Sequence, residues 1–367
     1  VSRGLGDVYK RQVLELASED LSLLDGYNYI VLGSTTEEQS IIIENEEISL
    51  EELYNAHCET LEPIFPTKSV DIKEKIETIN FISQGEAKKS SITIAKPRVF
   101  IPTFPGTNCE YDLQRAFEKA GANTNIEVFK NLTYKDIEDS IETIVNQIRK
   151  SQIIMLPGGF SAGDEPDGSA KFMATVFRNP KVAETINEFL TKQDGLMLGI
   201  CNGFQALIKL GLVPYGEIRE TTVDAPTLTY NNIGRHQSKI VRTRIASNKS
   251  PWLKATEVGD THSIAISHGE GKFVASEEVM RQLIANGQIA TQYVDFNDNA
   301  TYDIDFNPNG SYAAIEGITS PDGRVLGKMA HSERIGEGVA INIYGNQNQH
   351  IFESGVKSVS YTHLRAH

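Results

Sequence analysis

The chain has 367 residues, of which 40% are hydrophobic and 23% are charged, as is ordinary for a folded globular protein. Its formal net charge is −14, and no block rich in lysine and arginine stands out, so nucleic acid is not an expected partner. The three cysteines, Cys58, Cys109 and Cys201, are widely spaced and predict neither a disulfide framework nor a CxxC metal site. No apolar run approaches the roughly 18 residues of a membrane span, and there is no signal peptide, so we expect a cytoplasmic protein that contacts no membrane.

The two ends of the chain read as foreign sequence. Residues 1–12 (VSRGLGDVYKRQ) and 359–367 (VSYTHLRAH) lack a convincing amphipathic period, and codons can be chosen that make one the antisense copy of part of the other. A transposase-type sequencing adapter read in both directions would give such a pair. We therefore exclude both segments from the reasoning about fold, and expect the genuine sequence to come from a longer gene.

Residues 13–94 predict a small α+β segment followed by a connector. The apolar runs at 29–32 and 41–43 suit short strands, and a helix is expected over 49–61, with its first serine as the N-cap. Two prolines and the polar stretch GEAKKSS follow, which is typical of a connector. A domain boundary is therefore expected near residue 95.

From residue 98 onward, short apolar runs alternate with helical segments. The expected strands are 99–101, 125–129, 153–156 and 195–200; the expected helices are 110–120, 134–150, two segments before residue 195, and one that follows Cys201 through Leu210. Continuous apolar strands between helices predict an α/β fold with a parallel sheet covered on both faces. In such a sheet, ligands bind at the carboxyl ends of the strands.

Cys201 lies in the segment GICNG, between an expected strand and an expected helix. A nucleophile on a sharp strand-to-helix turn needs small residues two positions before and two after it. The helix N-terminus favours a thiolate, and the amide of Asn202 would point to where an oxyanion develops. The plain alternative is a structural cysteine at a helix start, but this context favours a nucleophile.

The glycine pair Gly158-Gly159 directly follows the expected strand 153–156. Glycines let the backbone approach a ligand closely, so these amides could complete an oxyanion hole. A plain loop is the alternative. A phosphate-binding loop fits poorly, because no GxxxxGK[ST] pattern is present here.

His331 and Glu333 supply the groups that a cysteine nucleophile requires. An imidazole can accept the thiol proton and later protonate the leaving group, and a carboxylate can hold the imidazole in the required tautomer. One residue between them suits an extended segment with both side chains on one face. A histidine near a carboxylate is more often structural, so Cys201 is what makes this pairing believable.

Several long motifs resemble class I glutamine amidotransferases: LPGGFSAGD, GICNGFQ and the His331/Glu333 pair. More narrowly, FIPTFPGTNCEYD, ISHGEGKF and NPNGSYAAIEGITSPDGRVLGKMAHSER are similar to the glutaminase domain of phosphoribosylformylglycinamidine synthases of purine biosynthesis. The resemblance covers residues 96–357. It implies a flavodoxin-like domain over 95–358 with a nucleophile elbow and a Cys201-His331-Glu333 triad.

The resemblance also implies roles for residues around the triad. Gly158 or Gly159 would belong to the oxyanion loop, with Asn202 supplying a second amide, and Gln205 would face the substrate amide. Many relatives have proline between the histidine and the glutamate, where this chain has Ser332. This departure changes the turn and keeps both functional groups.

Three further groups of residues carry weaker predictions. His268 and Glu270, in HGEG, could line the pocket or an interface, and His268 ranks below His331 as a base for Cys201. Cys109, in PGTNCE, is expected to be structural or near the pocket. The acidic residues Asp164, Glu165 and Asp167 have no accompanying histidine, so solvated loop charges are expected rather than a metal site.

The function implied by the resemblance is hydrolysis of L-glutamine to glutamate and ammonia. The ammonia would pass to a synthetase that uses ATP and Mg²⁺ to convert formylglycinamide ribonucleotide to its amidine. Residues 13–94 look like the tail of that synthetase, so we expect its domains to belong to the same polypeptide and this part of the chain to need no cofactor. The alternatives are a stand-alone glutaminase subunit, a flavodoxin-like cysteine hydrolase or peptidase, and a regulatory module with a degenerate site.

Overall fold

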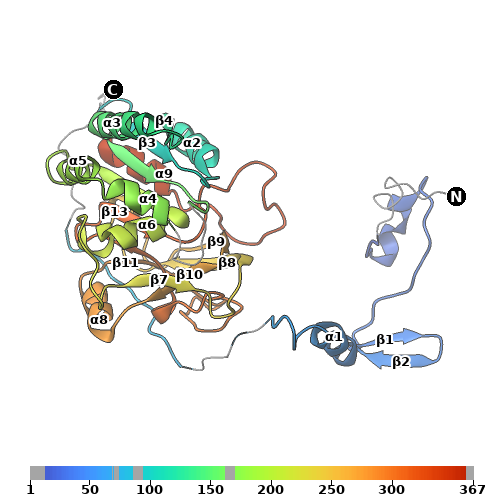
Figure 1. Ribbon diagram of the computed structural model, residues 1–367. Coiled ribbons are helices and arrows are strands. Elements are labelled where there is room, and N and C mark those ends of the chain that lie inside the picture. The colour runs from blue at the N-terminus through green and yellow to red at the C-terminus, as the bar shows by residue number, and fades with distance from the viewer. Residues whose placement is uncertain (1–12, 68, 70–73, 86–93, 162–169, 361–367) are drawn as a thin grey trace. The chain divides into compact units, whose positions relative to one another are not determined.

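The computed structural model describes residues 13–67, 69, 74–85, 94–161 and 170–360. The chain divides between Phe65 and Pro66 into two compact units, whose elements are labelled in Figure 1. Within the described residues, no helix is long and apolar enough to cross a membrane.

The smaller unit contains a hairpin and two helices. A 3₁₀ helix, η2 (Ser18–Leu24), is followed by the antiparallel strands β1 (Ser40–Ile43) and β2 (Glu46–Ser49) and by α1 (Leu50–Glu59). The Ser49 side chain accepts a hydrogen bond from the backbone N–H of Glu52 at 3.2 Å, which confirms the predicted cap. The run 29–32, expected as a strand, forms none. No residue of η2 or α1 is buried, so this unit has little core of its own.

A nine-stranded mixed sheet runs through the larger unit. Its strand order is β4-β3-β5-β6-β13-β12-β11-β8-β9. The parallel strands are β3 (Arg98–Thr103), β4 (Asn123–Val128), β5 (Ile153–Leu156), β6 (Leu196–Ile200) and β13 (Val325–Lys328). The antiparallel strands are β8 (Gln237–Ile245), β9 (Thr261–His268), β11 (Ile289–Tyr293) and β12 (Ile315–Thr319).

The α/β class and the first four parallel strands confirm the sequence prediction. Strands β3, β5 and β6 are buried apolar runs, whereas β4, at the edge of the sheet, is exposed or half-buried along its length. Helix α3 (Tyr134–Lys150) has the predicted bounds, and Thr133 and Asp136 form a capping box at its start. The antiparallel half of the sheet was not predicted. Its longest strands, β8 and β9, contain buried polar side chains such as Thr243 and His262, so they do not read as apolar runs.

The helices form two groups. Helix α2 (Glu110–Lys119) packs with α9 (Ile351–Val359), whereas α3 packs on α5 (Pro180–Thr191), and α4 (Lys171–Phe177) contacts α5 and α6 (Asn202–Leu210). The chain moves one way across the sheet from β3 to β4 and the other way from β4 to β5. Because such crossovers are right-handed, the α2 and α3 groups cover opposite faces.

The remaining elements are short. They are α7 (Leu212–Tyr215), α8 (Glu277–Ala285), the 3₁₀ helices η3 (Pro251–Leu253) and η4 (Tyr312–Ala314), and a two-stranded sheet of β7 (Thr227–Tyr230) and β10 (Glu270–Val274).

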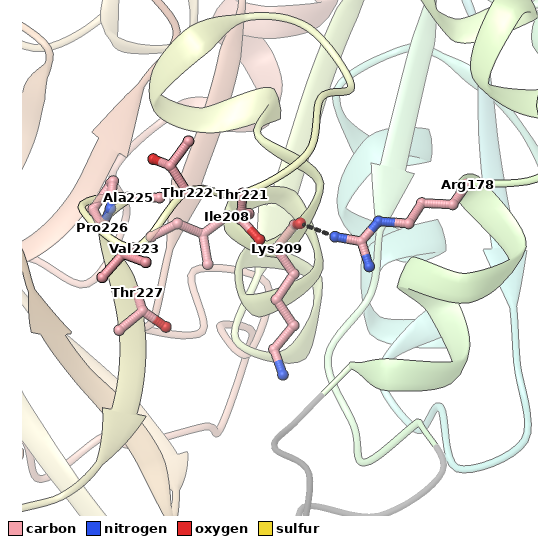
Figure 2. Close-up of a pocket in the computed structure, with 9 residues that line it drawn as sticks. All are labelled: Arg178, Ile208, Lys209, Thr221, Thr222, Val223, Ala225, Pro226 and Thr227. Atoms are coloured by element: carbon pink, nitrogen blue, oxygen red, sulfur yellow. Dashed lines mark hydrogen bonds between the residues drawn. The ribbon is translucent and has the colours of Figure 1, made fainter.

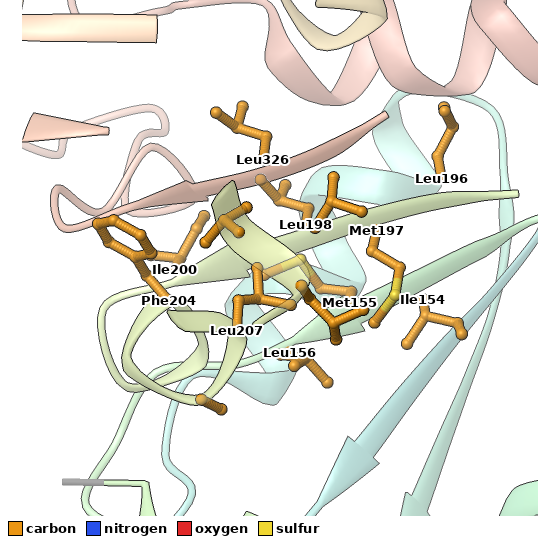
Figure 3. Packing of buried hydrophobic residues seen from close by; sticks show 14 of the residues in the cluster. Ile154, Met155, Leu156, Leu196, Met197, Leu198, Ile200, Phe204, Leu207 and Leu326 are labelled. Carbon is orange, nitrogen blue, oxygen red and sulfur yellow. The ribbon is translucent and has the colours of Figure 1, made fainter. Parts of the chain in front are cut away.

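The core under the candidate site is built from the central strands and α6. Side chains from β5, β6 and β13 pack together with Phe204 and Leu207 of α6 (Figure 3). All four residues of β5 and all five of β6 are buried. A strand buried on both faces between two parallel neighbours holds its carboxyl end in a fixed place, which is what a nucleophile at that end requires.

The larger unit includes part of the segment that the sequence predicted to be a connector. Phe81 N–H donates to the Ala246 carbonyl at 2.8 Å, and Ile79 N–H donates to Oε1 of Gln292 at 2.8 Å. Ile79 is buried in the main hydrophobic cluster. The observed division thus precedes the predicted boundary near residue 95, because these residues bond to the chain directly after β8 and to a side chain of β11.

The other end of the larger unit also extends slightly beyond the predicted boundary. Val359, in the segment excluded as adapter sequence, is buried at the end of α9, and its carbonyl accepts a hydrogen bond from Ile94 N–H at 3.2 Å. Residues 1–12 and 361–367 lie outside the described residues.

Candidate active site

Three neighbouring parallel strands bring the main motifs to one edge of the sheet. Strand β6 lies between β5 and β13, and it ends at Ile200, directly before Cys201. Strand β5 ends directly before Pro157 and the Gly158-Gly159 pair, and β13 ends three residues before His331. Because parallel strands end at the same edge, residues far apart in the sequence meet there.

Cys201 lies on the sharp turn that the sequence predicted. Its backbone has φ 53° and ψ −109°, a conformation that residues other than glycine rarely adopt. A Cβ at Gly203 would lie 2.0 Å from the carbonyl oxygen of Leu156, and one at Gly199 would lie 2.6 Å from the carbonyl oxygen of Gly203. Both glycines are therefore required sterically, and the turn is a nucleophile elbow in its geometry.

His331 and Glu333 form a buried pair. Nδ1 of His331 lies 2.5 Å from Oε1 of Glu333, and both side chains are at most 2% exposed. Burial opposes the imidazolium, but the charges of Glu333 and Cys201 outweigh it and raise the pKa of His331 well above its ordinary value. Burial likewise opposes the carboxylate, while the charge of His331 lowers the pKa of Glu333. Since the carboxylate occupies Nδ1, proton transfer to or from another group falls to Nε2.

Gly158 is the point where Cys201 and His331 approach each other. A Cβ at Gly158 would lie 3.0 Å from Cε1 of His331 and 3.6 Å from Cβ of Cys201. The Cys201 thiol is 3.7 Å from the carbonyl oxygen of Ser267, and His331 N–H donates to the carbonyl of Ala265 at 2.8 Å. Strand β9 thus contacts both residues through its backbone.

The loop after β5 is held in place from two sides. Asn108 N–H donates to the Gly158 carbonyl at 3.2 Å, and Phe160 N–H donates to the Gly106 carbonyl at 2.8 Å. Gly159 has φ 131°, and a Cβ there would lie 2.4 Å from the carbonyl oxygen of Gly106. These contacts fix the peptide groups of the Gly158-Gly159 pair beside Cys201.

Asn202 and Gln205 connect this loop to α6 and to the HGEG motif. Oδ1 of Asn202 accepts from Ser161 N–H at 3.1 Å, and its Nδ2 donates to Oε1 of Gln205 at 2.9 Å. Nε2 of Gln205 donates to the Glu270 carbonyl at 2.5 Å. The carboxamide of Gln205 is thus engaged within the protein, so its expected contact with the substrate amide stays a prediction.

His268 is buried and has a defined tautomer. Nδ2 of Asn231 donates to the Arg235 carbonyl at 2.9 Å and to the His268 carbonyl at 2.8 Å. The remaining polar atom of this side chain, Oδ1, can only accept, so Nδ1 of His268, 3.2 Å away, must donate to it. Nε2 of His268 carries no proton and has no hydrogen-bond partner among the described residues. Burial, with the charge of His331, lowers the pKa of His268 to about 3. So weak a base is less suited than His331 to take a proton from Cys201, and the choice of His331 stays a prediction. Glu270 is buried nearby.

Cys109 lies beside the pair formed by His331 and Glu333. Its sulfur is 3.9 Å from Nδ1 of His331, and Nη2 of Arg334 lies 3.1 Å from the same sulfur. Cys109, His331 and Glu333 each offer a potential ligand atom, all within 4.8 Å of one another. Arg334 opposes a metal ion there, because its positive charge already lies against the sulfur. The acidic residues 164, 165 and 167, discounted above as a metal site, lie outside the described residues.

A buried ion pair close to His331 and Glu333 was not predicted from the sequence. Lys328, at the end of β13, and Glu316, in β12, are 1% and 0% exposed and lie 3.2 Å apart. The signal that could have revealed them is a charged residue within each of two apolar runs, IEGIT and VLGK. A charge in a buried strand requires a partner, so the two residues could have been paired.

A cavity of about 390 Å³ lies elsewhere on the larger unit and is lined by Arg178, Lys209, Thr227 and neighbouring residues (Figure 2). Arg178 donates there to the Lys209 carbonyl at 2.6 Å. Lys209 is near the C-terminal end of α6, whereas Cys201 precedes its N-terminus. The nine residues of α6 separate the two by about 13 Å, so this cavity is not the candidate active site.

Comparison with known proteins identifies the same part of the chain. Residues 96–359 match the model of the CobB/CobQ-like glutamine amidotransferase domain. The chain is 35% identical over 190 residues to the phosphoribosylformylglycinamidine synthase subunit PurQ of Dehalococcoides mccartyi, covering 52% of this chain and 68% of the relative. It is 36% identical over 244 residues to the same subunit of Methanococcus maripaludis, covering 65% of this chain and 82% of the relative.

A solved structure agrees with these relatives. The structure of PurLQS from Thermotoga maritima matches with a TM-score of 0.50 and 27% sequence identity, covering 71% of this chain and 98% of the matched chain. The family match spans well over half of the residues and includes every strand of the nine-stranded sheet. The chain therefore belongs to the CobB/CobQ-like glutamine amidotransferase domain family.

Proposed function

We propose that this chain is the glutaminase part of a phosphoribosylformylglycinamidine synthase, in which Cys201 is the nucleophile. One observation carries the proposal. Cys201, on its strained turn, and the buried His331–Glu333 pair both lie at the edge of the sheet where β5, β6 and β13 end. The PurQ relatives and the PurLQS structure support the choice of this enzyme within the family.

The first half of the reaction forms a thioester. The sulfur of Cys201 attacks the side-chain carbonyl carbon of glutamine while its proton passes to Nε2 of His331. The amides of Asn202 and of the Gly158-Gly159 pair face the developing oxyanion. The carbon–nitrogen bond then breaks as His331 returns a proton to the leaving nitrogen, which departs as ammonia.

The second half of the reaction releases glutamate. Water gives a proton to Nε2 of His331 and attacks the thioester carbon, and the carbon–sulfur bond breaks. The proton returns to the sulfur, which restores Cys201. Glu333 stays ionised throughout and stabilises the imidazolium that forms in each half.

The ammonia is consumed by a synthetase that uses ATP and Mg²⁺ to convert formylglycinamide ribonucleotide to its amidine. We place that synthetase on the same polypeptide, since residues 13–95 precede the family match and include a helix and a hairpin. Three free cysteines are consistent with a cytoplasmic enzyme. The alternative is a separate glutaminase subunit, which reading the gene upstream of Val13 tests: a start codon shortly before it would contradict the fused form.

Glutamine hydrolysis by the purified chain tests the proposed activity. We expect glutamate release, and formation of γ-glutamyl hydroxamate when hydroxylamine replaces water as the acceptor of the thioester. Cys201→Ala should lower both by about a thousandfold or more, because the nucleophile is lost. Cys58→Ala is the matched control, since Cys58 lies in the other unit, and it should change neither. Peptide cleavage without glutaminase activity would instead identify a cysteine peptidase.

A further inference from the structure

The segment that bears His331 and Glu333 rests on a buried ion pair that the reaction does not use. Nζ of Lys328 lies 3.2 Å from Oε1 of Glu316, and neither side chain is more than 1% exposed. Burying two charges costs several kcal/mol per ion before their attraction is counted, so such a pair needs further hydrogen bonds. Those hydrogen bonds go to the catalytic segment.

The ammonium of Lys328 reaches along residues 330–332. It donates to the Ala330 carbonyl at 2.6 Å and to Oγ of Ser332 at 3.0 Å, so with Glu316 its three hydrogens are all engaged. Glu316 completes the arrangement from the neighbouring strand, since its Oε1 accepts from Ala330 N–H at 2.7 Å. The residue directly before His331 is therefore held at both its N–H and its carbonyl.

Ser332, between His331 and Glu333, is held from both sides as well. Its hydroxyl accepts from Lys328 and donates to Oε1 of Gln349 at 2.7 Å. Nε2 of Gln349 donates in turn to Oγ1 of Thr243 at 3.1 Å, which ties the segment to β8. A proline at position 332 could make neither contact, so the serine noted in the sequence is what allows both hydrogen bonds.

We infer that Lys328, Glu316, Ser332 and Gln349, the Lys328 network, are positioning residues that keep His331 and Glu333 in register with Cys201. None of the four touches the reacting atoms. The contact they protect is the 2.5 Å hydrogen bond between His331 and Glu333, and small displacements of such groups lower rates strongly. The inference rests on the proposed function, because it concerns the rate of the same reaction.

The experiment must separate positioning from stability alone. Lys328→Met combined with Glu316→Gln removes both charges and leaves no unpaired buried ion, so the chain should fold. We expect its glutaminase kcat to fall by about tenfold or more, while KM for glutamine changes by less than about threefold. The limb of the pH–rate profile that reports His331 should move to lower pH, because a looser contact with Glu333 raises its pKa less.

Substitutions of Ser332 disturb the network less and include a conservative variant that should restore activity. Ser332→Ala removes the hydroxyl that joins Lys328 to Gln349 and should lower kcat and shift the profile in the same direction. Ser332→Thr keeps the hydroxyl and should restore both towards the parent values. If Ser332→Ala and Ser332→Thr behave alike, the bridging hydroxyl has no positioning role.

The other end of β13 supplies a matched control. Arg324 is also nearly buried and pairs with Asp194 at 3.4 Å, but it lies at the end of the strand away from the candidate site. Arg324→Met should lower the unfolding temperature and leave kcat and the pH profile of the folded enzyme unchanged. The positioning role is overturned if the Lys328 variants lose thermal stability in the same way with parent kcat and pH profile. Absence of glutaminase activity in the parent chain would instead refute the proposed function.

Discussion

The backbone of Cys201 has a conformation that cysteine seldom adopts, and the surrounding contacts hold it there. Its N–H donates to the Lys328 carbonyl at 2.8 Å, so strand β13 fixes the residue from one side. Gly203 allows α6 to approach β5 from the other side. Backbone strain of this kind persists only where neighbouring structure imposes it, and it places the sulfur outside the sheet.

Gly203→Ala tests this close approach. The new Cβ would lie 2.0 Å from the Leu156 carbonyl oxygen, so either α6 or the end of β5 must move. We expect the free energy of unfolding to fall by about 1–3 kcal/mol and glutaminase activity to fall more steeply than stability. Thermal unfolding and kcat/KM measure the two effects, and a variant with parent activity would show that the elbow tolerates the shift.

Glu333→Gln tests the charge pairing of His331 through pH. The raised pKa of His331 gives stability that is complete below its ordinary pKa of 6.5 and is lost as pH rises through the folded value. The lowered pKa of Glu333 gives stability that is complete above its ordinary pKa of 4.5 and is lost as pH falls through the folded value. The destabilisation caused by Glu333→Gln should therefore be largest between pH 4.5 and 6.5.

Glu333→Gln should also lower glutaminase activity. Glutamine at 333 cannot stabilise the imidazolium by charge, so kcat should fall by about a hundredfold. Denaturant unfolding from pH 4 to 9 and the pH–rate profile supply the measurements. A stability difference that does not vary with pH would mean that the two residues are not charge-paired.

At the scale of elements, α6 links two segments that lie near Cys201. Asn202, its first residue, bonds to Ser161 in the loop after β5 and to Gln205 one turn later, and Gln205 bonds to the HGEG motif. One helix thus joins the loop after β5 to the start of β10.

Asn202→Ala breaks this connection while keeping the backbone amide of residue 202. We expect kcat/KM for glutamine to fall by about tenfold, because the loop bearing the Gly158-Gly159 pair loses an anchor. Asn202→Asp, which can still accept from Ser161 N–H, should lose less. Equal losses in both variants, measured in the same assay, would place the effect elsewhere than at Ser161.

Much of the parallel half of the sheet could be predicted because local signals there agree with the fold. Helix α3 has an apolar period and a capping box, and β5 is a continuous apolar run, so their bounds follow from the sequence. Strand β8 lacks such signals, because its buried residues include Thr243 and Arg244, which bond to distant residues. The strands of the antiparallel half are fixed by pairing with strands far away in the sequence, which local patterns do not reveal.

Some features of the candidate site could likewise be predicted from the sequence, and others could not. The bonded pair of His331 and Glu333 follows from a short spacing and the chemistry that Cys201 needs, and so could be predicted. The bond of Asn231 to His268 and the placing of Lys328 beneath His331 depend on which strands become neighbours. Spacing along the chain does not carry that information.

At the scale of the whole molecule, the division between Phe65 and Pro66 predicts which truncations fold. A chain of residues 66–367 keeps the contacts of Ile79 with β11 and of Phe81 with the residue directly after β8, and it should unfold at the temperature of the larger unit in the parent chain. A chain of residues 96–367 loses both, and should be less stable by about 2–4 kcal/mol, since a fully buried apolar side chain such as Ile79 contributes about 1.5–3 kcal/mol and the half-buried Phe81 contributes less.

Calorimetry of the two truncations tests this division. Ile79→Ala in the 66–367 chain is the matched control and should account for part of the difference. Equal unfolding temperatures for the two truncations would show that residues 74–85 add nothing to the larger unit.

The order of strands has a consequence for the time at which the chain becomes reactive. Cys201 and the loop after β5 are synthesised early, but β13, which delivers His331 and Glu333, comes late and must enter between β6 and β12. Until it does, the sulfur faces a site with no base and no bond from its N–H to Lys328. A newly made or partly opened chain therefore presents Cys201 without its proposed base, and we expect ammonia release only after the last central strand closes the sheet.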